Sequence, residues 1–276
     1  MMHSPITPAD AATAAPAVAP VVALATCQGC RTGAPLRTAI TMAFQPIVDI
    51  RTGSIFAYEA LVRGTEGQSA GEVLSGIEPD MIYKFDQACR VKAIELAGTL
   101  FAPDDGAKLS INFMPNAVYE PNACIRASLS AARRVGFDPG RLMFEFTENE
   151  EMVDVGHVRH IIEAYQARGF TTAIDDFGAG YAGLALLADL RPDMLKLDMA
   201  LIRGIDSSAS RRTIVASVVR MADDLGIRCI AEGIETAAEL QTLREIGLRL
   251  CQGYLLARPA VEALPVCALD IIPLQA

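Results

Sequence analysis

The chain has 276 residues, of which 51% are hydrophobic and 21% charged, and its formal net charge is −9. This composition is typical of a globular chain with enough apolar residues for a sizeable core. The excess of acidic residues, with no basic stripe, argues against a protein that binds a nucleic-acid polymer by neutralising its phosphates. A small anionic ligand remains compatible with this charge if metal ions bridge it.

Residues 1–40 are rich in Ala, Pro and Thr, contain no Lys or Arg before Arg31, and show neither a helical nor a strand period. Such a composition predicts a disordered leader. The apolar run 15–25 is interrupted by Pro16 and Pro20 and is too short to span a bilayer, and no positively charged segment precedes it as in a secretory signal. We therefore expect a cytoplasmic protein with no membrane span.

From residue 41 onward, strand and helix patterns alternate. The expected strands are 41–48, 55–62, 108–113, 141–146, 171–175, 194–198, 228–231 and 250–254. The expected helices are 82–100, 122–135, 153–167, 183–189, 208–225 and 236–246. This alternation predicts an α/β fold with a mostly parallel sheet, closed as a (β/α)₈ or TIM barrel over residues 41–265 and followed by a tail, 266–276.

The first two expected strands are the exception to this order. They are joined only by residues 49–54, which are too few for the crossover that parallel strands need. The sequence therefore predicts a modified barrel with an antiparallel first strand pair.

A barrel of this kind gathers the carboxyl ends of its strands around one mouth. Most expected strands end at or near an acid, amide or amine, and these residues are Glu59, Asn112, Glu145, Asp175, Asp176, Lys196, Asp198, Glu232 and Gln252. Asp175 and Asp176 are adjacent and lead into a Gly-Ala-Gly turn. Because a strand places successive side chains on opposite faces, the two cannot both point into one core. Taken alone, a polar turn explains this pair about as well as a cation site does.

Several carboxylates at one mouth would repel each other, and an isolated buried carboxylate costs on the order of tens of kcal/mol by Born estimates. Divalent cations would offset this cost. A set of carboxylate and amide oxygens suits Mg²⁺ or Mn²⁺ rather than Zn²⁺. Two such ions about 3.5–4 Å apart can activate a water and stabilise a leaving oxygen in phosphodiester cleavage. Lys196 and Arg63 could contact the phosphate.

Cysteine and histidine chemistry is not favoured. The 7 cysteines show no framework spacing, which indicates reduced thiols. Cys27 and Cys30 form a lone CxxC pair without a second pair or a nearby His, which does not favour a zinc site. Of the 3 histidines, His157 and His160 are three residues apart and are expected on a solvated helix face.

The strand-end motifs, taken together, resemble those of EAL-domain cyclic di-GMP phosphodiesterases over residues 41–260. In chain order they are Glu59-Ala60-Leu61 with Arg63, Asn112-Phe113-Met114-Pro115, Glu145-Phe146-Thr147-Glu148, Asp175-Asp176-Phe177-Gly178, Lys196-Leu197-Asp198, Glu232-Gly233-Ile234-Glu235 and Gln252-Gly253-Tyr254. Each motif alone is weak. The ordered set at barrel spacing is a strong signal.

The resemblance implies a role for each of these positions. Metal ligands would be Glu59, Asn112, Glu145, Asp175 and Asp176. Glu232 would be the general base for the attacking water, and Lys196 would contact the water or the phosphate. Substrate-binding residues would be Gln45, Leu61, Arg63, Asp198 and Gln252. Glu148 and Glu235 would anchor the loop after Asp176, although both could simply be acids at helix starts.

The resemblance further implies Mg²⁺ or Mn²⁺ as cofactor, inhibition by Ca²⁺, a homodimer, and a possible separate sensor or regulator protein. The expected reaction is hydrolysis of cyclic di-GMP to linear pGpG. The alternative is a receptor or protein-binding antagonist that keeps the fold without turnover, and an unrelated TIM-barrel enzyme is a third reading. Ala179, Ala182 and Met114 replace hydroxyl residues common in the family, which puts loop ordering and dimer coupling in question. All expected metal and base residues are present, which favours the enzyme.

Overall fold

The computed structural model of the protein describes residues 38–114, 121–147, 155–179 and 184–268. The leader up to residue 37, with Cys27 and Cys30, lies outside the described residues. So do Glu148, Ala182 and most of the expected tail. The predictions made for these positions therefore stay predictions.

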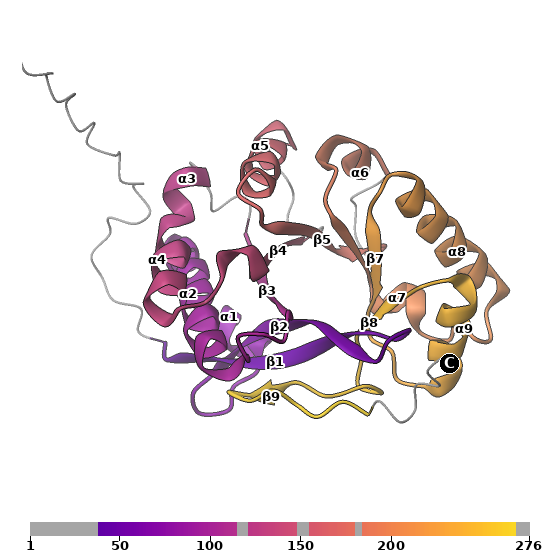
Figure 1. Cartoon of the computed structure of the whole chain (residues 1–276), viewed down its shortest axis with the longest axis horizontal. Coiled ribbons are helices and arrows are strands. Elements are labelled where there is room, and N and C mark those ends of the chain that lie inside the picture. The colour runs from indigo at the N-terminus through magenta and orange to yellow at the C-terminus, as the bar shows by residue number, and fades with distance from the viewer. Residues whose placement is uncertain (1–37, 115–120, 148–154, 180–183, 269–276) are drawn as a thin grey trace, which may run out of the picture.

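The strands close into a barrel (Figure 1). They are β1 (Ile40–Asp49), β2 (Ser54–Gly64), β3 (Lys108–Phe113), β4 (Leu142–Thr147), β5 (Thr171–Phe177), β6 (Met194–Leu197), β7 (Arg228–Ala231) and β8 (Leu250–Cys251). From β2 to β8 each strand is parallel to the next. β1 closes the ring antiparallel to both β2 and β8. The predicted α/β barrel with an antiparallel first pair is confirmed.

Helices follow the strands and lie outside the barrel (Figure 1). The longer ones are α2 (Ile82–Leu100), α4 (Arg126–Val135), α5 (Val155–Gln166), α6 (Leu184–Leu190), α8 (Ala209–Asp224) and α9 (Ala237–Ile246). Their bounds agree with the expected helices to within a few residues, except that the helix expected over 122–135 is divided at Ile125 into α3 (Pro121–Cys124) and α4.

Several short elements were not predicted, because they are too brief to show a hydrophobic period. They are α1 (Ala70–Ser75), α7 (Met199–Ile202), β9 (Ala260–Val261) and the 3₁₀ turns η2 (Pro79–Met81) and η4 (Pro139–Arg141). The strand expected over 250–254 ends at Cys251. Gly253 explains this early end, since a Cβ there would lie 2.1 Å from the carbonyl oxygen of Ile234. The chain must bend closely past Ile234 at this point, and only glycine fits.

The barrel interior has an apolar layer and a polar layer. The apolar layer is a separate cluster formed by Ile47, Ala57, Met143, Ala173, Met194, Ile230 and Leu250. Two residues further along the parallel strands, on the same inward face, come Glu59, Glu145, Asp175, Lys196, Glu232 and Gln252. Because residues two apart on a strand face the same side, each strand places an apolar side chain in the floor of the barrel and a polar side chain above it at the mouth.

A buried ion pair supports the end of β3 from outside the barrel. On α2, Arg90 Nη2 lies 2.9 Å from Asp86 Oδ2, and both side chains are almost fully buried. Asp86 Oδ1 accepts a hydrogen bond from the backbone N of Met114 at 3.3 Å. The Arg90 guanidinium carbon lies 4.7 Å from the ring centre of Phe113. The pair thus fixes the backbone just beyond Asn112.

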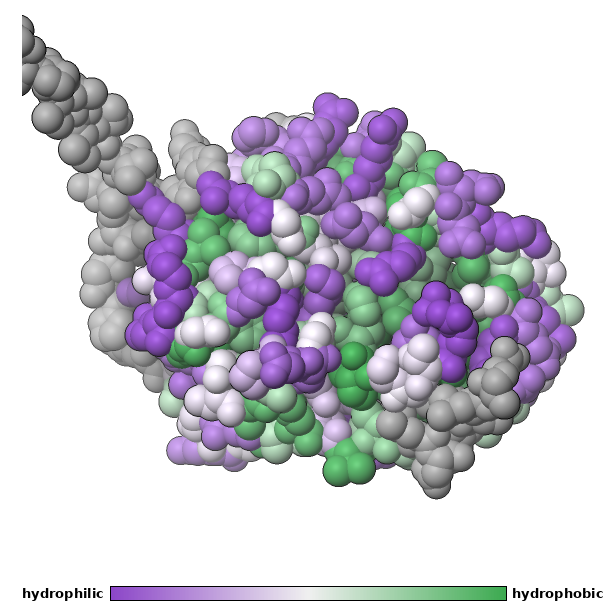
Figure 2. Space-filling model, in the orientation of Figure 1, coloured by the Kyte–Doolittle hydropathy of each residue, from purple (hydrophilic) through white to green (hydrophobic). Residues whose placement is uncertain are grey.

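The surface of the described part is mixed in polarity. Figure 2 shows hydrophilic residues spread over the viewed face with hydrophobic ones between them. Within the described ranges, no helix combines the length and the apolarity needed to cross a membrane.

Candidate active site at the carboxyl ends of the strands

Lys196 stands at the centre of the polar layer. Its side chain is 1% exposed, and it projects from β6 into the polar layer of the barrel, where four carboxylates surround it. The distances from its Nζ are 2.6 Å to Glu232 Oε1, 2.8 Å to Glu145 Oε2, 3.0 Å to Asp175 Oδ1 and 3.6 Å to Glu59 Oε2. One ammonium therefore holds together carboxylates from β2, β4, β5 and the end of β7.

Burial and charge act on these groups in opposite directions. Burial alone would lower the pKa of Lys196, but the surrounding carboxylates outweigh it and raise the pKa well above its ordinary value. Burial raises the pKa of Glu145 to about 8 against the pull of Lys196, and the charges of Glu59 and Asp175 add to the rise. Burial and the charge of Asp175 raise the pKa of Glu232 well above its ordinary value. Glu145 and Glu232 therefore hold a proton more strongly than an ordinary glutamate does.

Glu59 is buried, and two side-chain amides donate hydrogen bonds to its carboxylate. Its Oε1 accepts from Asn112 Nδ2 at 3.1 Å, and its Oε2 accepts from Gln252 Nε2 at 2.7 Å. Burial would raise the pKa of Glu59, but Lys196 and these two hydrogen bonds outweigh it and lower the pKa. Gln252 Nε2 also lies 3.3 Å from Gln45 Oε1, and Gln45 Nε2 donates to the carbonyl of Ala257. The amides therefore orient Glu59 at the mouth.

Asp175 and Asp176 reach the same site despite being neighbours in sequence. Asp176 has a φ of 57°, in the left-handed region, and the pairing of β5 with β6 shifts register between Ile174 and Phe177. This irregularity breaks the strict alternation of a strand, and Asp is one of the few residues that tolerates it. The backbone N of Asp176 donates to Asp175 Oδ1 at 2.9 Å. Strand alternation alone could not show how both acids face one mouth.

The donor atoms fit a pair of divalent cations. Oxygens of Glu59, Glu145 and Asp175 lie within 4.8 Å of one another, and so do oxygens of Asp175, Asp176 and Glu232. Both groups contain Asp175, so its carboxylate could bind two neighbouring ions. These five carboxylates and the Lys196 ammonium carry a formal charge of −4, which two divalent ions would balance. In addition, Gln252 Oε1 is a buried acceptor without a hydrogen-bond partner among the described residues. An all-oxygen set of this kind matches Mg²⁺ or Mn²⁺.

The expected residues at the edge of the site are less tightly held. Leu61 and Arg63 follow Glu59 on the same face of β2, both are half-buried, and Arg63 Nη1 donates to the carbonyl of Val62 at 2.7 Å. Asp198 caps α7 by accepting from the backbone N of Ala200 at 2.8 Å. Their contact with substrate stays a prediction.

Glu235 forms an ion pair with Arg203, which follows α7. The hydrogen bond from Arg203 is the main cause that lowers the pKa of Glu235. The loop that Glu235 was expected to anchor continues into residues 180–183, which lie outside the described part of the chain. Its anchoring role therefore stays a prediction, and the ion pair with Arg203 is a contact that the sequence did not indicate.

Ser110 belongs to the site although the motifs did not single it out. Its side chain is fully buried, and its Oγ donates to Glu145 Oε1 at 2.5 Å. A signal was present in the sequence, because Ser110 precedes Asn112 by two residues on one strand and must share its inward face.

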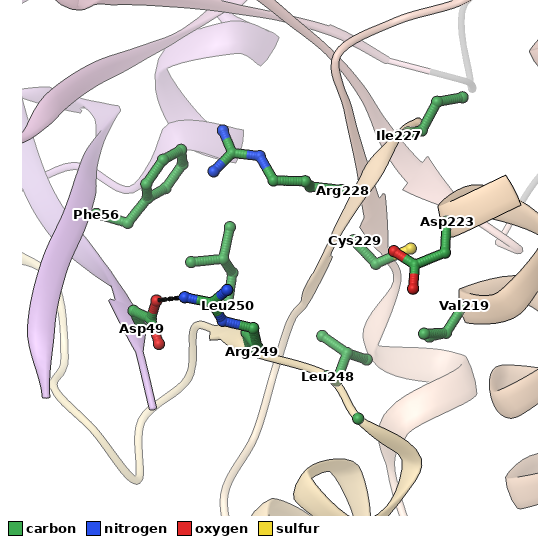
Figure 3. Close-up of a pocket in the computed structure, with 11 residues that line it drawn as sticks. Asp49, Phe56, Val219, Asp223, Ile227, Arg228, Cys229, Leu248, Arg249 and Leu250 are labelled. Carbon is green, nitrogen blue, oxygen red and sulfur yellow. Dashed lines mark hydrogen bonds and ion pairs between the residues drawn. The ribbon is translucent and has the colours of Figure 1, made fainter. Parts of the chain in front are cut away.

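A cavity lies at the other end of the barrel. Its volume is about 320 Å³, and it opens beside the amino ends of β7 and β8 (Figure 3). There Arg249 Nη2 pairs with Asp49 Oδ2 at 2.6 Å, and the Arg228 guanidinium lies 4.8 Å from the ring centre of Phe56. Because barrels of this class carry their chemistry at the carboxyl ends of the strands, we assign the active site to the acidic mouth.

Comparison with known proteins gives one family. A sequence model described as the EAL domain matches residues 33–259. In Escherichia coli K12, the blue light- and temperature-regulated antirepressor BluF is 31% identical over 227 residues, covering 82% of this chain and 56% of BluF. In Pseudomonas aeruginosa PAO1, the cyclic di-GMP phosphodiesterase NbdA is 32% identical over 243 residues, covering 82% of this chain and 29% of NbdA. The chain thus spans about half, or less, of the length of these relatives.

A solved structure matches over nearly its whole length. It is the c-di-GMP-bound form of a standalone versatile EAL protein from Vibrio cholerae O395, with a TM-score of 0.82 and 49% sequence identity. The match covers 86% of this chain and 99% of that one.

Proposed function

Because the chain belongs to the EAL-domain family, we propose that it is a phosphodiesterase that hydrolyses cyclic di-GMP to linear pGpG with the help of divalent cations. The observation that carries this proposal is the acidic mouth, where two oxygen clusters share Asp175 and surround Lys196. The name of NbdA and the nucleotide bound by the Vibrio cholerae protein support the choice of substrate.

In this mechanism, Glu232 accepts a proton from the attacking water. Its carboxyl stands at the end of β7, is 17% exposed, and therefore faces the open side of the cluster. Glu145 is fully buried by comparison, so it is better placed to hold a cation than to exchange a proton with solvent.

The remaining residues bind and orient. Glu59, Asn112, Glu145, Asp175 and Asp176 would hold two cations, which when bound supply charge neutralisation at the phosphate and a more acidic water. Lys196 limits the repulsion between the acids and contacts the water or the phosphate. Arg63 would contact a second phosphate oxygen, and Gln45, Leu61, Asp198 and Gln252 would line the substrate.

Other parts of the proposal rest on the family resemblance. We propose a role in bacterial signalling, in which hydrolysis lowers the level of the messenger, with a cytoplasmic location, a homodimer, and a possible separate sensor or regulator protein. The antirepressor BluF favours a second candidate, in which the barrel binds nucleotide or protein without turnover. Product formation separates the two.

Calcium is expected to bind the site and to support nucleotide binding without turnover. Ca²⁺ forms longer bonds and a looser, higher-coordinate shell, so it would displace the attacking water from line with the scissile bond and acidify it less. The measurement is paired, with nucleotide affinity by calorimetry and pGpG formation by chromatography in Mg²⁺, Mn²⁺ or Ca²⁺ after chelator treatment. Equal turnover in Ca²⁺ and Mg²⁺, or turnover without any metal, would contradict the two-cation proposal.

A further inference from the structure

Both oxygens of Glu145 have fixed partners on opposite sides. Oε2 lies 2.8 Å from the ammonium of Lys196, and Oε1 accepts the hydroxyl of Ser110 at 2.5 Å. All three side chains are at most 1% exposed. Glu145 is therefore held in a single orientation by a donor at each end of its carboxylate.

The serine donor comes from the floor of the site. In the pairing of β3 with β4, Asn112 lies opposite Glu145, and Ser110 lies opposite Met143 of the apolar layer. The serine is thus one step below the amide expected to hold a cation. Its hydroxyl approaches Glu145 from below, while Lys196 approaches the other oxygen.

This arrangement restricts how Glu145 can bind a cation. Each oxygen of Glu145 keeps one lone pair beyond the one that Ser110 or Lys196 engages. Because the Ser110 hydrogen bond holds Oε1 toward the floor of the site, Oε2 is the oxygen left to bind a cation. Mg²⁺ and Mn²⁺ in octahedral sites accept single oxygens at strict geometry, whereas Ca²⁺ readily takes both oxygens of a carboxylate. Hydrogen bonds to a ligand from outside its coordination shell commonly affect metal affinity by about 10–100-fold.

We propose that Ser110 is a positioning residue that makes Glu145 a one-oxygen ligand and so favours Mg²⁺ and Mn²⁺ over Ca²⁺. The proposal rests on the proposed function, because it requires Glu145 to hold a cation. If Ser110 served only to make a buried hydrogen bond, removing its hydroxyl would change the stability of the fold. It would not change the affinity for Mn²⁺ and Mg²⁺ relative to Ca²⁺.

The chain offers a matched control for this distinction. Ser128 on α4 is also fully buried, and its hydroxyl has no hydrogen-bond partner in the described part of the chain. Ser110→Ala and Ser128→Ala therefore remove the same atom from equally buried positions, one beside Glu145 and one away from it. Ser110→Thr keeps the hydroxyl and serves as the conservative variant.

The test is calorimetric titration of chelator-treated protein with Mn²⁺, Mg²⁺ and Ca²⁺ in the absence of nucleotide. Ser110→Ala is expected to lose about 10–100-fold in Mn²⁺ and Mg²⁺ affinity and clearly less in Ca²⁺ affinity. Ser128→Ala and Ser110→Thr should keep the selectivity of the parent. Melting temperatures measured alongside show which variants are folded.

Three outcomes would overturn the inference. The first is parent-like Mn²⁺ affinity in Ser110→Ala, and the second is an equal loss for all three ions. If Ser110→Ala does not fold, Ser110→Cys takes its place, because a thiol is a weak hydrogen-bond donor. The third outcome is that Ser110→Cys keeps the parent's selectivity for Mn²⁺ and Mg²⁺ over Ca²⁺. A parent protein that binds none of the ions would overturn the proposed function itself. If the parent binds the ions and Ser110→Ala binds them with the same affinities, only the role of Ser110 is overturned, and the proposed function stands.

Discussion

Replacing Glu232 with Gln is expected to lower the rate of cyclic di-GMP hydrolysis by about 10²–10⁴-fold, the usual contribution of a general base. The amide keeps the size of the side chain and can still hydrogen-bond, but it cannot accept a proton. Nucleotide binding should largely survive, because Glu232 is the most exposed of the carboxylates around Lys196 and the others remain to hold cations.

The measurement is the steady-state rate of pGpG formation, with nucleotide affinity determined on the same preparation. Glu245→Gln is the matched control, since Glu245 is exposed on α9 and contacts Gln241 away from the mouth. Turnover by Glu232→Gln at the parental rate would show that another group is the base. Loss of nucleotide binding together with rate would show that Glu232 mainly binds rather than accepts the proton.

Replacing Lys196 with Met is expected to destabilise the fold by about 3–5 kcal/mol in the presence of chelator, the usual cost of removing one partner from a buried ion pair. Met has nearly the same shape, so the main change is loss of the charge that four carboxylates face. Because a domain of ordinary stability unfolds at a cost of about 5–15 kcal/mol, this is a large fraction of the total.

Urea unfolding with chelator, and again with Mn²⁺, measures this effect. The cation should recover part of the lost stability, because it supplies positive charge to the same carboxylates. Lys108→Met is the control, since Lys108 begins β3 at the other end of the barrel, where its Nζ donates to the carbonyl of Gly140. If Lys196→Met were as stable as the parent in chelator, the lysine would not be the charge that stabilises the cluster.

Most of the barrel could be predicted because its strands repeat a simple pattern. An apolar run that meets a polar residue predicts a strand whose polar side chain faces the mouth, and Glu59, Glu145 and Lys196 lie there, although β2 continues beyond Glu59 to Gly64. The short loop after β1 predicted its antiparallel pairing. These features are local in sequence, so no knowledge of distant contacts was needed.

The rest depends on contacts between distant segments. The left-handed backbone conformation of Asp176 turns its side chain toward the mouth, whereas the regular alternation of a strand would point it away. Asp86 and Arg90 hold the end of β3 from a helix that gave no sign of a polar role. Ser110 looks like an ordinary strand residue until the register of β3 and β4 places it beneath Glu145. Residues of these kinds gain their roles only through packing.

Product formation is the most direct test of metal-dependent hydrolysis at the acidic mouth. Chelator-treated protein is incubated with cyclic di-GMP, with and without Mn²⁺ or Mg²⁺, and the nucleotides are separated by chromatography. We expect pGpG only when the cation is present, and little or none with Glu232→Gln. Intact cyclic di-GMP in every reaction, with nucleotide bound to the protein, would contradict the account and identify the barrel as a receptor.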